Sequence, residues 1–241
     1  GYTGNGIKIS IGDDGLEIAH EDLKDNVISG SYDYENSDND PTQPSSCPET
    51  GSCVGHGTSV AGIIAAKGWN NIGVRGVAPN ASIFGDNFLG NSSKYNESRG
   101  VNSPGGVTAD IYNMSYGVGY PKDDDDEQES TYSLSKSLKY NSTSIFEEAF
   151  VNGVTNLRDG KGAIYVKSSG NYYNTQSGSD CGEGKELSCT ETSIDRNNQS
   201  PYIINVGSIN ADGVKSSYSS PGSSIWVSGF GGEYGYDSSI Y

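Results

Sequence analysis

The sequence predicts one α/β domain in which helices cover both faces of a mostly parallel sheet. Short runs rich in Ile, Val, Phe and Tyr alternate with stretches of helical periodicity, and this alternation is typical of parallel sheets. A length of 241 residues suits a single hydrophobic core. Polar residues directly follow several apolar runs, as expected where ligands bind at the carboxyl ends of parallel strands. We therefore expect a single domain over residues 1–241.

Seven strands and two helices account for this pattern. The strands are expected at 7–12, 26–32, 82–88, 110–114, 163–168, 202–206 and 224–227, and the helices at 56–67 and 144–157. In the second helix, apolar residues from Ile145 to Val154 recur at helical spacing. Glu147 and Glu148 lie in its first turn, where the helix dipole favours negative charge. Strands and helices interleaved in this way indicate the α/β class.

The balance of charges excludes a nucleic acid as the partner. Asp and Glu total 31 against 15 Lys and Arg, which gives a net charge of −16, whereas phosphate binding requires clusters of basic residues. An acidic field attracts basic substrates instead. No apolar run approaches the roughly 20 residues that a membrane-spanning helix needs, so we expect no membrane span.

The four cysteines form two close pairs, Cys47 with Cys53 and Cys181 with Cys189. Four cysteines allow three pairings, but short loops closed by nearest neighbours are the easiest to form. Two local disulfides would indicate an oxidising, extracytoplasmic setting. A zinc site is less favoured, because neither pair has the Cys-x-x-Cys spacing and the chain has two histidines in total.

Two short motifs supply a carboxylate and an imidazole. Asp13 follows the apolar run of 7–12, and His56 lies within Gly-His-Gly-Thr-Ser at the start of the first expected helix. An Asp that orients a His, which in turn takes a proton from a hydroxyl, makes a serine nucleophilic at neutral pH. A lone His is more often structural, but here glycines on both sides leave room for a substrate backbone. The two motifs together predict the acid and base of a serine protease.

These motifs resemble the subtilisin-like serine proteases, the subtilases of peptidase family S8. The order Asp then His is the order of that family, and Asp13-Asp14-Gly15 followed by His20-Glu21-Asp22-Leu23 is similar to its kexin and furin branch. The resemblance extends from Gly4 to about Gly222. It implies a subtilisin-like three-layer fold, with Asp13 and His56 as two members of an Asp-His-Ser triad.

The strand expected at 163–168 leads into Ser-Ser-Gly-Asn, which resembles the family's strand that ends in Ser-Gly-Asn or Ala-Gly-Asn. The resemblance implies that Asn171 is the oxyanion-hole donor, whose side-chain amide binds the oxygen that becomes negative in the tetrahedral intermediate. One such donor contributes roughly 3 kcal/mol. Without Asp13 and His56, Gly-Asn would be read as an ordinary turn dipeptide.

The resemblance also implies a groove that binds an extended peptide as an added strand, so that selectivity comes from the pockets that line it. For the residue before the cleaved bond, one wall would consist of Ser115, Tyr116 and Gly117, and the other of Ser168, Ser169 and Gly170.

Acidic residues in these pockets select Lys or Arg in kexin-like enzymes. Asp195 matches the carboxylate at the base of the first pocket, Asp180 matches a neighbouring calcium ligand, and Asp14 favours a basic residue in the next pocket. The loop 172–200 is longer than the family pattern. A shifted alignment would therefore exchange Asp180 and Asp195 with other acids of this loop, which are Glu183, Glu186 and Glu191.

A calcium site is implied by the resemblance as well. Its ligands would be the carboxylate of Asp22, the side-chain oxygen of Asn70 and the carbonyl oxygens of Lys67, Ile72 and Val74. Calcium accepts about six to eight oxygen ligands, so an N-terminal segment or water would supply the rest. We therefore expect Ca²⁺ as the cofactor.

The nucleophile is not among these residues. Family members carry it in Gly-Thr-Ser at the start of a helix, and the one Gly-Thr-Ser here, residues 57–59, belongs to the histidine motif. By the family's spacing the serine would lie beyond Tyr241. We expect the chain to be a catalytic domain that is truncated at both ends.

Two functions remain open. The first is a secreted, calcium-dependent serine endopeptidase that hydrolyses polypeptides after Lys or Arg, with a propeptide or chaperone as partner. The second is an inert protease-like domain that binds peptides in the surviving groove. A calcium-binding structural module explains Asp22 and Asn70 but leaves the catalytic motifs unexplained. We prefer the endopeptidase, because Asp13, His56 and Asn171 all retain their matched contexts.

Overall fold

The computed structural model of the chain describes residues 2–43, 55–89, 98–117, 145–171, 173 and 191–233. Its strands are β1 (Lys8–Gly12), β2 (Ser82–Asp86), β3 (Ile111–Met114), β4 (Ile164–Ser168), β5 (Ile203–Ile209) and β6 (Ile225–Phe230), which are hydrogen-bonded in the order β2-β1-β3-β4-β5-β6. The helices include α1 (His56–Ala65) and α4 (Ile145–Asn156). The predicted α/β class is confirmed.

The chain divides into two compact units. The first comprises Gly1–Ser115 and Ser142–Tyr165, and the second comprises Tyr116–Asn141 and Val166–Tyr241. The expectation of one domain over the whole chain stays a prediction.

In the first unit, β1 lies between two parallel neighbours. Ile9 of β1 is in register with Ile83 of β2 and with Ile111 of β3. Four of the five residues of β1 are buried, as expected for a strand that is covered on both faces. The carboxyl end of β1, and with it Asp13, is therefore held from both edges.

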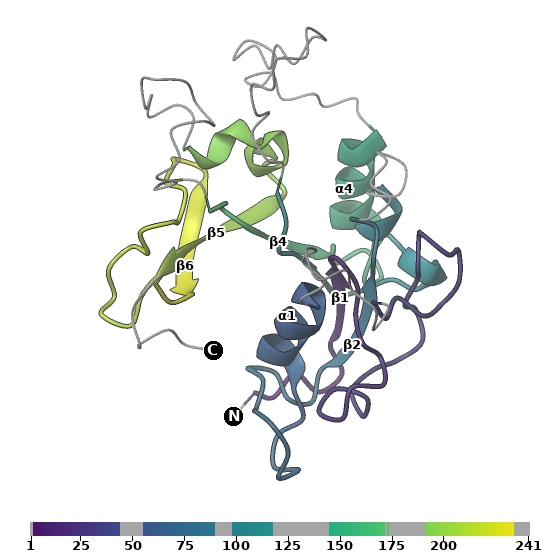
Figure 1. Cartoon of the computed structure of the whole chain (residues 1–241). Coiled ribbons are helices and arrows are strands. Elements are labelled where there is room, and N and C mark those ends of the chain that lie inside the picture. The colour runs from purple at the N-terminus through teal and green to yellow at the C-terminus, as the bar shows by residue number, and fades with distance from the viewer. Residues whose placement is uncertain are drawn as a thin grey trace, which may run out of the picture. The chain divides into compact units, whose positions relative to one another are not determined.

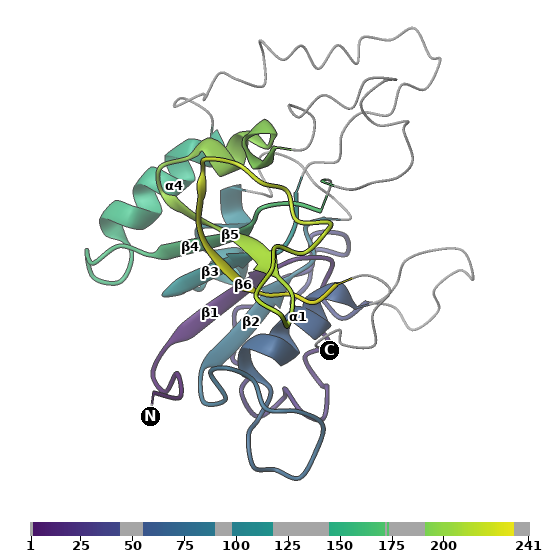
Figure 2. The ribbon, with the colours of Figure 1, turned by 90° about the vertical axis from the view of Figure 1, so that its left-hand side faces the viewer.

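The two helices cover opposite faces of these strands. Ile111 of β3 packs against a hydrophobic cluster that contains Ile9 of β1 and Ala61 of α1. The next residue, Tyr112, stacks on Tyr165 with 5.1 Å between the ring centroids, and Phe150 of α4 meets Tyr165 edge-on at 4.7 Å. Because successive residues of a strand point to opposite faces, α1 and α4 lie on opposite sides of the sheet, as Figures 1 and 2 show.

In the second unit, β5 and β6 pair in parallel with a shift of register between Asn205 and Val206. Two short 3₁₀ helices precede them, η3 (Thr192–Ile194) and η4 (Arg196–Gln199). Asp195 separates these helices and accepts a hydrogen bond from the backbone N–H of Asn197 through Oδ1, at 2.9 Å. It thereby caps η4, which fixes the direction of its carboxylate.

One expected strand is wrong, and two others are longer than expected. Residues 26–32 form no strand but make two isolated bridges, Val27 with Ile83 and Tyr32 with Asp86. Between the bridges, Gly30 has a φ of 126°, and a Cβ there would lie 2.8 Å from Val107. This backbone conformation interrupts the ladder. β5 and β6 continue beyond the expected ends, to Ile209 and Phe230.

Some predictions fall outside the described residues. All four cysteines, and with them both expected disulfides, lie there, as does Asp180. The first residue of the second expected helix, 144, also lies outside, and α4 is described from Ile145 onward.

Candidate active site

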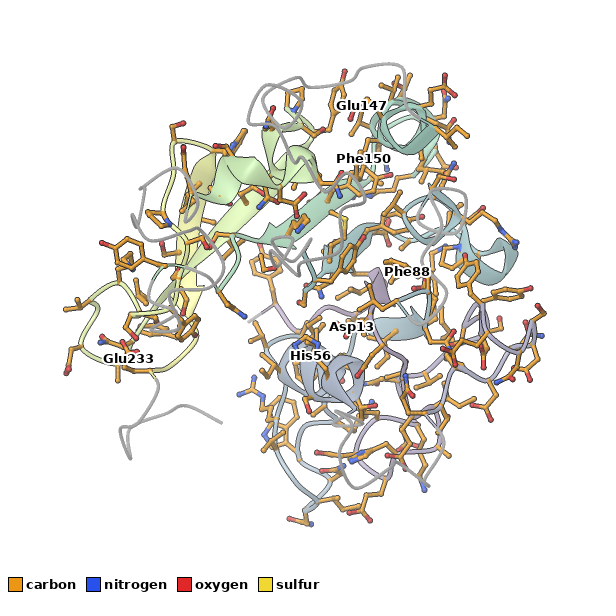
Figure 3. The ribbon with its side chains drawn as sticks, turned by 45° about the horizontal axis from the view of Figure 1, so that its top comes forward. Asp13, His56, Phe88, Glu147, Phe150 and Glu233 are labelled. Atoms are coloured by element: carbon orange, nitrogen blue, oxygen red, sulfur yellow. The ribbon has the colours of Figure 1, made fainter. Side chains whose placement is uncertain are left out.

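Asp13 and His56 meet where β1 ends and α1 begins. The backbone N–H of Asp13 donates to the carbonyl of Asp86 at 3.1 Å, which extends the β1–β2 ladder by one residue. His56 is the first residue of α1, and its Nδ1 lies 2.7 Å from Oδ1 of Asp13. Figure 3 shows the two labelled side chains next to each other. The structure thus brings together the two predicted triad residues.

A glycine lets α1 approach this closely. A Cβ on Gly57 would lie 2.1 Å from the carbonyl oxygen of Gly15 and 2.7 Å from the Cβ of Asp13. Both distances are far below van der Waals contact, so any side chain at this position would push α1 away from β1. Gly57 therefore sets the short separation between Asp13 and His56.

The carboxylate of Asp14 caps α1. Its Oδ2 accepts from the backbone N–H of His56 at 3.0 Å, and its Oδ1 accepts from the N–H of Gly57 at 2.8 Å. The first N–H groups of a helix have no partner within the helix, and a carboxylate there is favourable. The sequence interpretation gave Asp14 a role in a substrate pocket and missed this capping role.

Asp13 and His56 differ in exposure, and their hydrogen bond affects the pKa of each. Asp13 is fully buried, whereas the side chain of His56 is 56% exposed. Burial raises the pKa of Asp13, although its hydrogen bond with His56 acts in the opposite direction. The hydrogen bond with Asp13 raises the pKa of His56. Since an ionised carboxylate can only accept, it holds the proton on Nδ1 and leaves Nε2 as the basic nitrogen.

A second carboxyl group, that of Asp86, lies close by and was not anticipated. Asp86 ends β2 and is fully buried. Neither of its side-chain oxygens accepts a hydrogen bond from the described residues. Burial, with a contribution from the charge of Asp13, raises the pKa of Asp86 well above its usual value. Burial therefore favours the protonated form of this carboxyl group.

In the second unit, Asn171 follows the end of β4 and is exposed. The residues before it are anchored: the N–H of Ser169 donates to the carbonyl of Val206 at 3.0 Å, and the carbonyl of Gly170 accepts from Ser220 at 2.9 Å. Gly170 has a φ of 103°, which favours glycine. Asn171 thus extends into solvent from a fixed turn.

The residues predicted to line the first pocket lie in both units. Ser115 belongs to the first, where its Oγ accepts a hydrogen bond from Asn113 at 2.9 Å. Tyr116, Gly117 and the run Ser168–Gly170 belong to the second. Ser168 is half-buried, and Ser169 is buried with its Oγ 3.3 Å from that of Ser219.

Asp195, the predicted base of the first pocket, forms an ion pair with Lys167. The ammonium of Lys167, from β4, lies 2.9 Å from its Oδ2, and both side chains are largely buried. Nothing in the sequence interpretation had given Lys167 a role. Its position one residue before the Ser-Ser-Gly-Asn motif was the available signal.

The predicted calcium ligands lie together in the first unit. Asp22 is buried, and its Oδ1 accepts from the side-chain amide of Asn70 at 2.7 Å, while its Oδ2 accepts from the N–H of Val74 at 2.9 Å. The N–H of Lys67 donates to the carbonyl of Asp22 at 2.9 Å, and that of Ile72 donates to Oδ1 of Asn70 at 3.2 Å. The segment 67–74 is therefore wrapped around one carboxylate.

These residues fit a calcium ion by their chemistry. No cluster of three or more His, Cys, Asp or Glu side chains suited to a metal occurs in the described part of the chain, so a cation here would depend on amide and carbonyl oxygens. Such oxygens are the ligands that Ca²⁺ prefers. Turning the amide of Asn70 over would direct its oxygen, in place of its nitrogen, toward the Asp22 carboxylate, and a cation between them would balance the two oxygens.

The structure is that of an α/β protein in which Asp13 and His56 are paired at the carboxyl end of β1. Residues 4–237 match the Subtilase family, and the chain belongs to this family. The resemblance to the subtilases predicted from the sequence is confirmed.

Similar proteins include an extracellular serine protease and kexin. The Aeromonas extracellular serine protease of Aeromonas sobria is 36% identical over 246 residues, which cover 98% of this chain and 36% of that protein. Kexin of Saccharomyces cerevisiae is 34% identical over 242 residues, which cover 99% of this chain and 26% of kexin.

A solved structure supports the fold assignment. The crystal structure of the Aeromonas sobria serine protease in complex with a chaperone aligns with a TM-score of 0.73 at 34% identity, over 98% of this chain and 37% of that chain. The predicted subtilisin-like fold is confirmed. The chain spans about a third of the length of these Aeromonas relatives.

Proposed function

We propose that this chain is the catalytic part of a serine endopeptidase in which Asp13 and His56 activate a serine. The observation that carries the proposal is the 2.7 Å contact between Nδ1 of His56 and Oδ1 of Asp13, made at the carboxyl end of a buried parallel strand. Membership of the subtilase family supplies the class of reaction.

In this proposal each residue takes one step of the reaction. Asp13 holds the proton on Nδ1, so Nε2 of His56 takes the proton of the serine hydroxyl as its oxygen attacks the peptide carbonyl. Asp13 then stabilises the imidazolium, which gives the proton to the departing amine. The side-chain amide of Asn171 would donate to the oxygen that becomes negative in the intermediate. A water molecule, activated by the same imidazole, releases the acyl group.

The proposed cofactor is Ca²⁺, held by Asp22, Asn70 and the carbonyl oxygens of Lys67, Ile72 and Val74. Its support is the buried carboxylate around which the segment 67–74 is wrapped. The ion would add stability to this segment and takes no part in the chemical step. Such binding stabilises the folded state by mass action.

The proposed substrates are polypeptides with Lys or Arg before the cleaved bond. The net charge of −16, the carboxylates of Asp195 and Asp14, and the similarity to kexin support this preference.

A secreted location is proposed because a relative is an extracellular serine protease. Among the described residues, none of the helices combines the length and the hydropathy needed to cross a bilayer. A chaperone or propeptide is the proposed folding partner, since the Aeromonas sobria protease has been crystallised with a chaperone.

The test is the hydrolysis of matched reporter peptides that end in Arg or Phe by the full-length protein. We expect the Arg reporter to be cleaved faster, and His56→Ala to abolish cleavage of both. Ser59→Ala is the matched control, because Ser59 is exposed and its Oγ only donates to the carbonyl of Gly55 at 3.2 Å. Folded protein that binds the reporters without cleaving them would establish the inert peptide-binding domain instead.

A further inference from the structure

Lys167 carries a buried positive charge next to the predicted specificity pocket. Its side chain is 1% exposed. A buried ammonium is costly unless it is paired and hydrogen-bonded, so its partners account for its presence. They are Oδ2 of Asp195 at 2.9 Å, the carbonyl oxygen of Tyr116, to which Nζ donates, and the ring of Tyr116, whose centroid lies 5.4 Å from Nζ.

The ion pair borders a glycine of the predicted pocket wall. A Cβ on Gly117 would lie 3.5 Å from Oδ2 of Asp195 and 3.7 Å from Nζ of Lys167. Tyr116, Gly117, Lys167 and Asp195 all belong to the second unit. The wall segment, the carboxylate and the ammonium therefore form one cluster, which we call the Lys167 cluster.

Within this cluster the carboxylate of Asp195 is paired with the ammonium of Lys167 and is largely buried. Oδ1 of Asp195 is engaged by the N–H of Asn197 at 2.9 Å, and Oδ2 is buried beside the ammonium. A cationic side chain from a substrate could bind Oδ2 only by displacing Lys167 or by sharing the carboxylate with it. A neutral side chain would meet no such competition, because it needs no counter-ion.

We infer that Lys167 is a specificity-determining residue that competes with the substrate's basic side chain for Asp195. This inference rests on the proposed function. The carboxylate of Asp195 favours Arg over a neutral residue, and its ion pair with Lys167 weakens this preference. Removing the charge of Lys167 leaves a buried carboxylate without a counter-ion, and a substrate cation would restore the pair.

The test is the ratio of kcat/KM for Arg and Phe reporters in the full-length enzyme. We expect Lys167→Gln, which keeps a donor for the Tyr116 carbonyl, to raise the Arg-to-Phe ratio by about 10- to 100-fold. Lys161→Met is the matched control. Because Lys161 is exposed, this substitution should leave the Arg-to-Phe ratio unchanged. Lys167→Met replaces the Gln variant if thermal unfolding shows that the latter does not fold.

A second variant tests the ammonium from the opposite side. Asp195→Asn leaves Lys167 without its counter-ion, so a reporter that ends in Glu should gain at least about tenfold over Phe relative to the wild type. An unchanged Arg-to-Phe ratio in folded Lys167 variants, or no gain for Glu in folded Asp195→Asn, would overturn the inference. If the wild type cleaves neither reporter, the proposed function fails, whereas His56-dependent cleavage with unchanged ratios refutes the role of Lys167 alone.

Discussion

Replacing Asp86 with Asn should change how stability depends on pH. The stability of the variant minus that of the wild type should increase as the pH rises from acid to neutral. Asp86 is fully buried with both side-chain oxygens unpaired among the described residues, and burial raises its pKa well above 3.8. Between its pKa in the unfolded chain and its raised pKa in the folded protein, the carboxyl group is ionised when the chain is unfolded and protonated when it is folded. Folding therefore takes up a proton, and stability falls as the pH rises between the two pKa values.

The size of the effect follows from this linkage. Each pH unit within the window costs the wild type about 1.4 kcal/mol of stability through this one group. Asp86→Asn keeps the shape and removes the titration, so the stability difference between variant and wild type should grow as the pH rises above the ordinary carboxyl pKa, by at most about 1.4 kcal/mol per pH unit. Contributions of other groups cancel in the difference.

Urea-induced unfolding of both proteins at pH 5 and pH 6 measures this difference. Equal slopes of stability against pH in the two proteins would refute the reasoning, because they would mean that Asp86 is ionised in the folded state. A loss of stability in the variant that is independent of pH would report only a change in packing, and would refute it equally.

Four further outcomes follow from the site. Asp13→Asn should lower kcat about 10⁴-fold, because an amide favours the wrong tautomer of His56; steady-state kinetics measures it, and a loss below tenfold would contradict it. Because the pKa of His56 is raised, activity should fall as the pH drops through a midpoint above 6.5, and a kcat/KM profile with a lower midpoint would disagree. Gly57→Ala places a Cβ 2.1 Å from a backbone oxygen and should cost about 10²-fold in kcat/KM, whereas wild-type rates would show that the close approach is unnecessary. Chelation of calcium should lower the Tm of the wild type but not that of Asp22→Ala, and equal shifts in both would place the ion elsewhere.

The positions of Asp13 and His56 could be predicted because both lie at the boundary of an element. An apolar run fixes where β1 ends, and the glycine-flanked His marks where α1 begins. Ligands bind at the carboxyl ends of parallel strands, which indicated a site at Asp13, and the resemblance of both motifs to subtilases indicated that His56 belongs to the same site.

What could not be predicted depends on partners that are distant in sequence. β4 was expected from its apolar residues, and nothing in that pattern shows that Lys167 is buried or that its counter-ion is Asp195. The sequence also does not show that the carboxyl group of Asp86 is buried without a hydrogen-bond donor among the described residues. The expected strand at 26–32 failed for a local reason, because Gly30 adopts a backbone conformation that a regular strand does not contain.

The central claim is that His56, oriented by Asp13, activates a serine nucleophile. Its most direct test is the labelling of the folded full-length protein with a fluorophosphonate, followed by mapping of the adduct by mass spectrometry. The account predicts one labelled serine in the wild type and none in His56→Ala. Folded wild-type protein that is not labelled, or labelling that persists in His56→Ala, would contradict it.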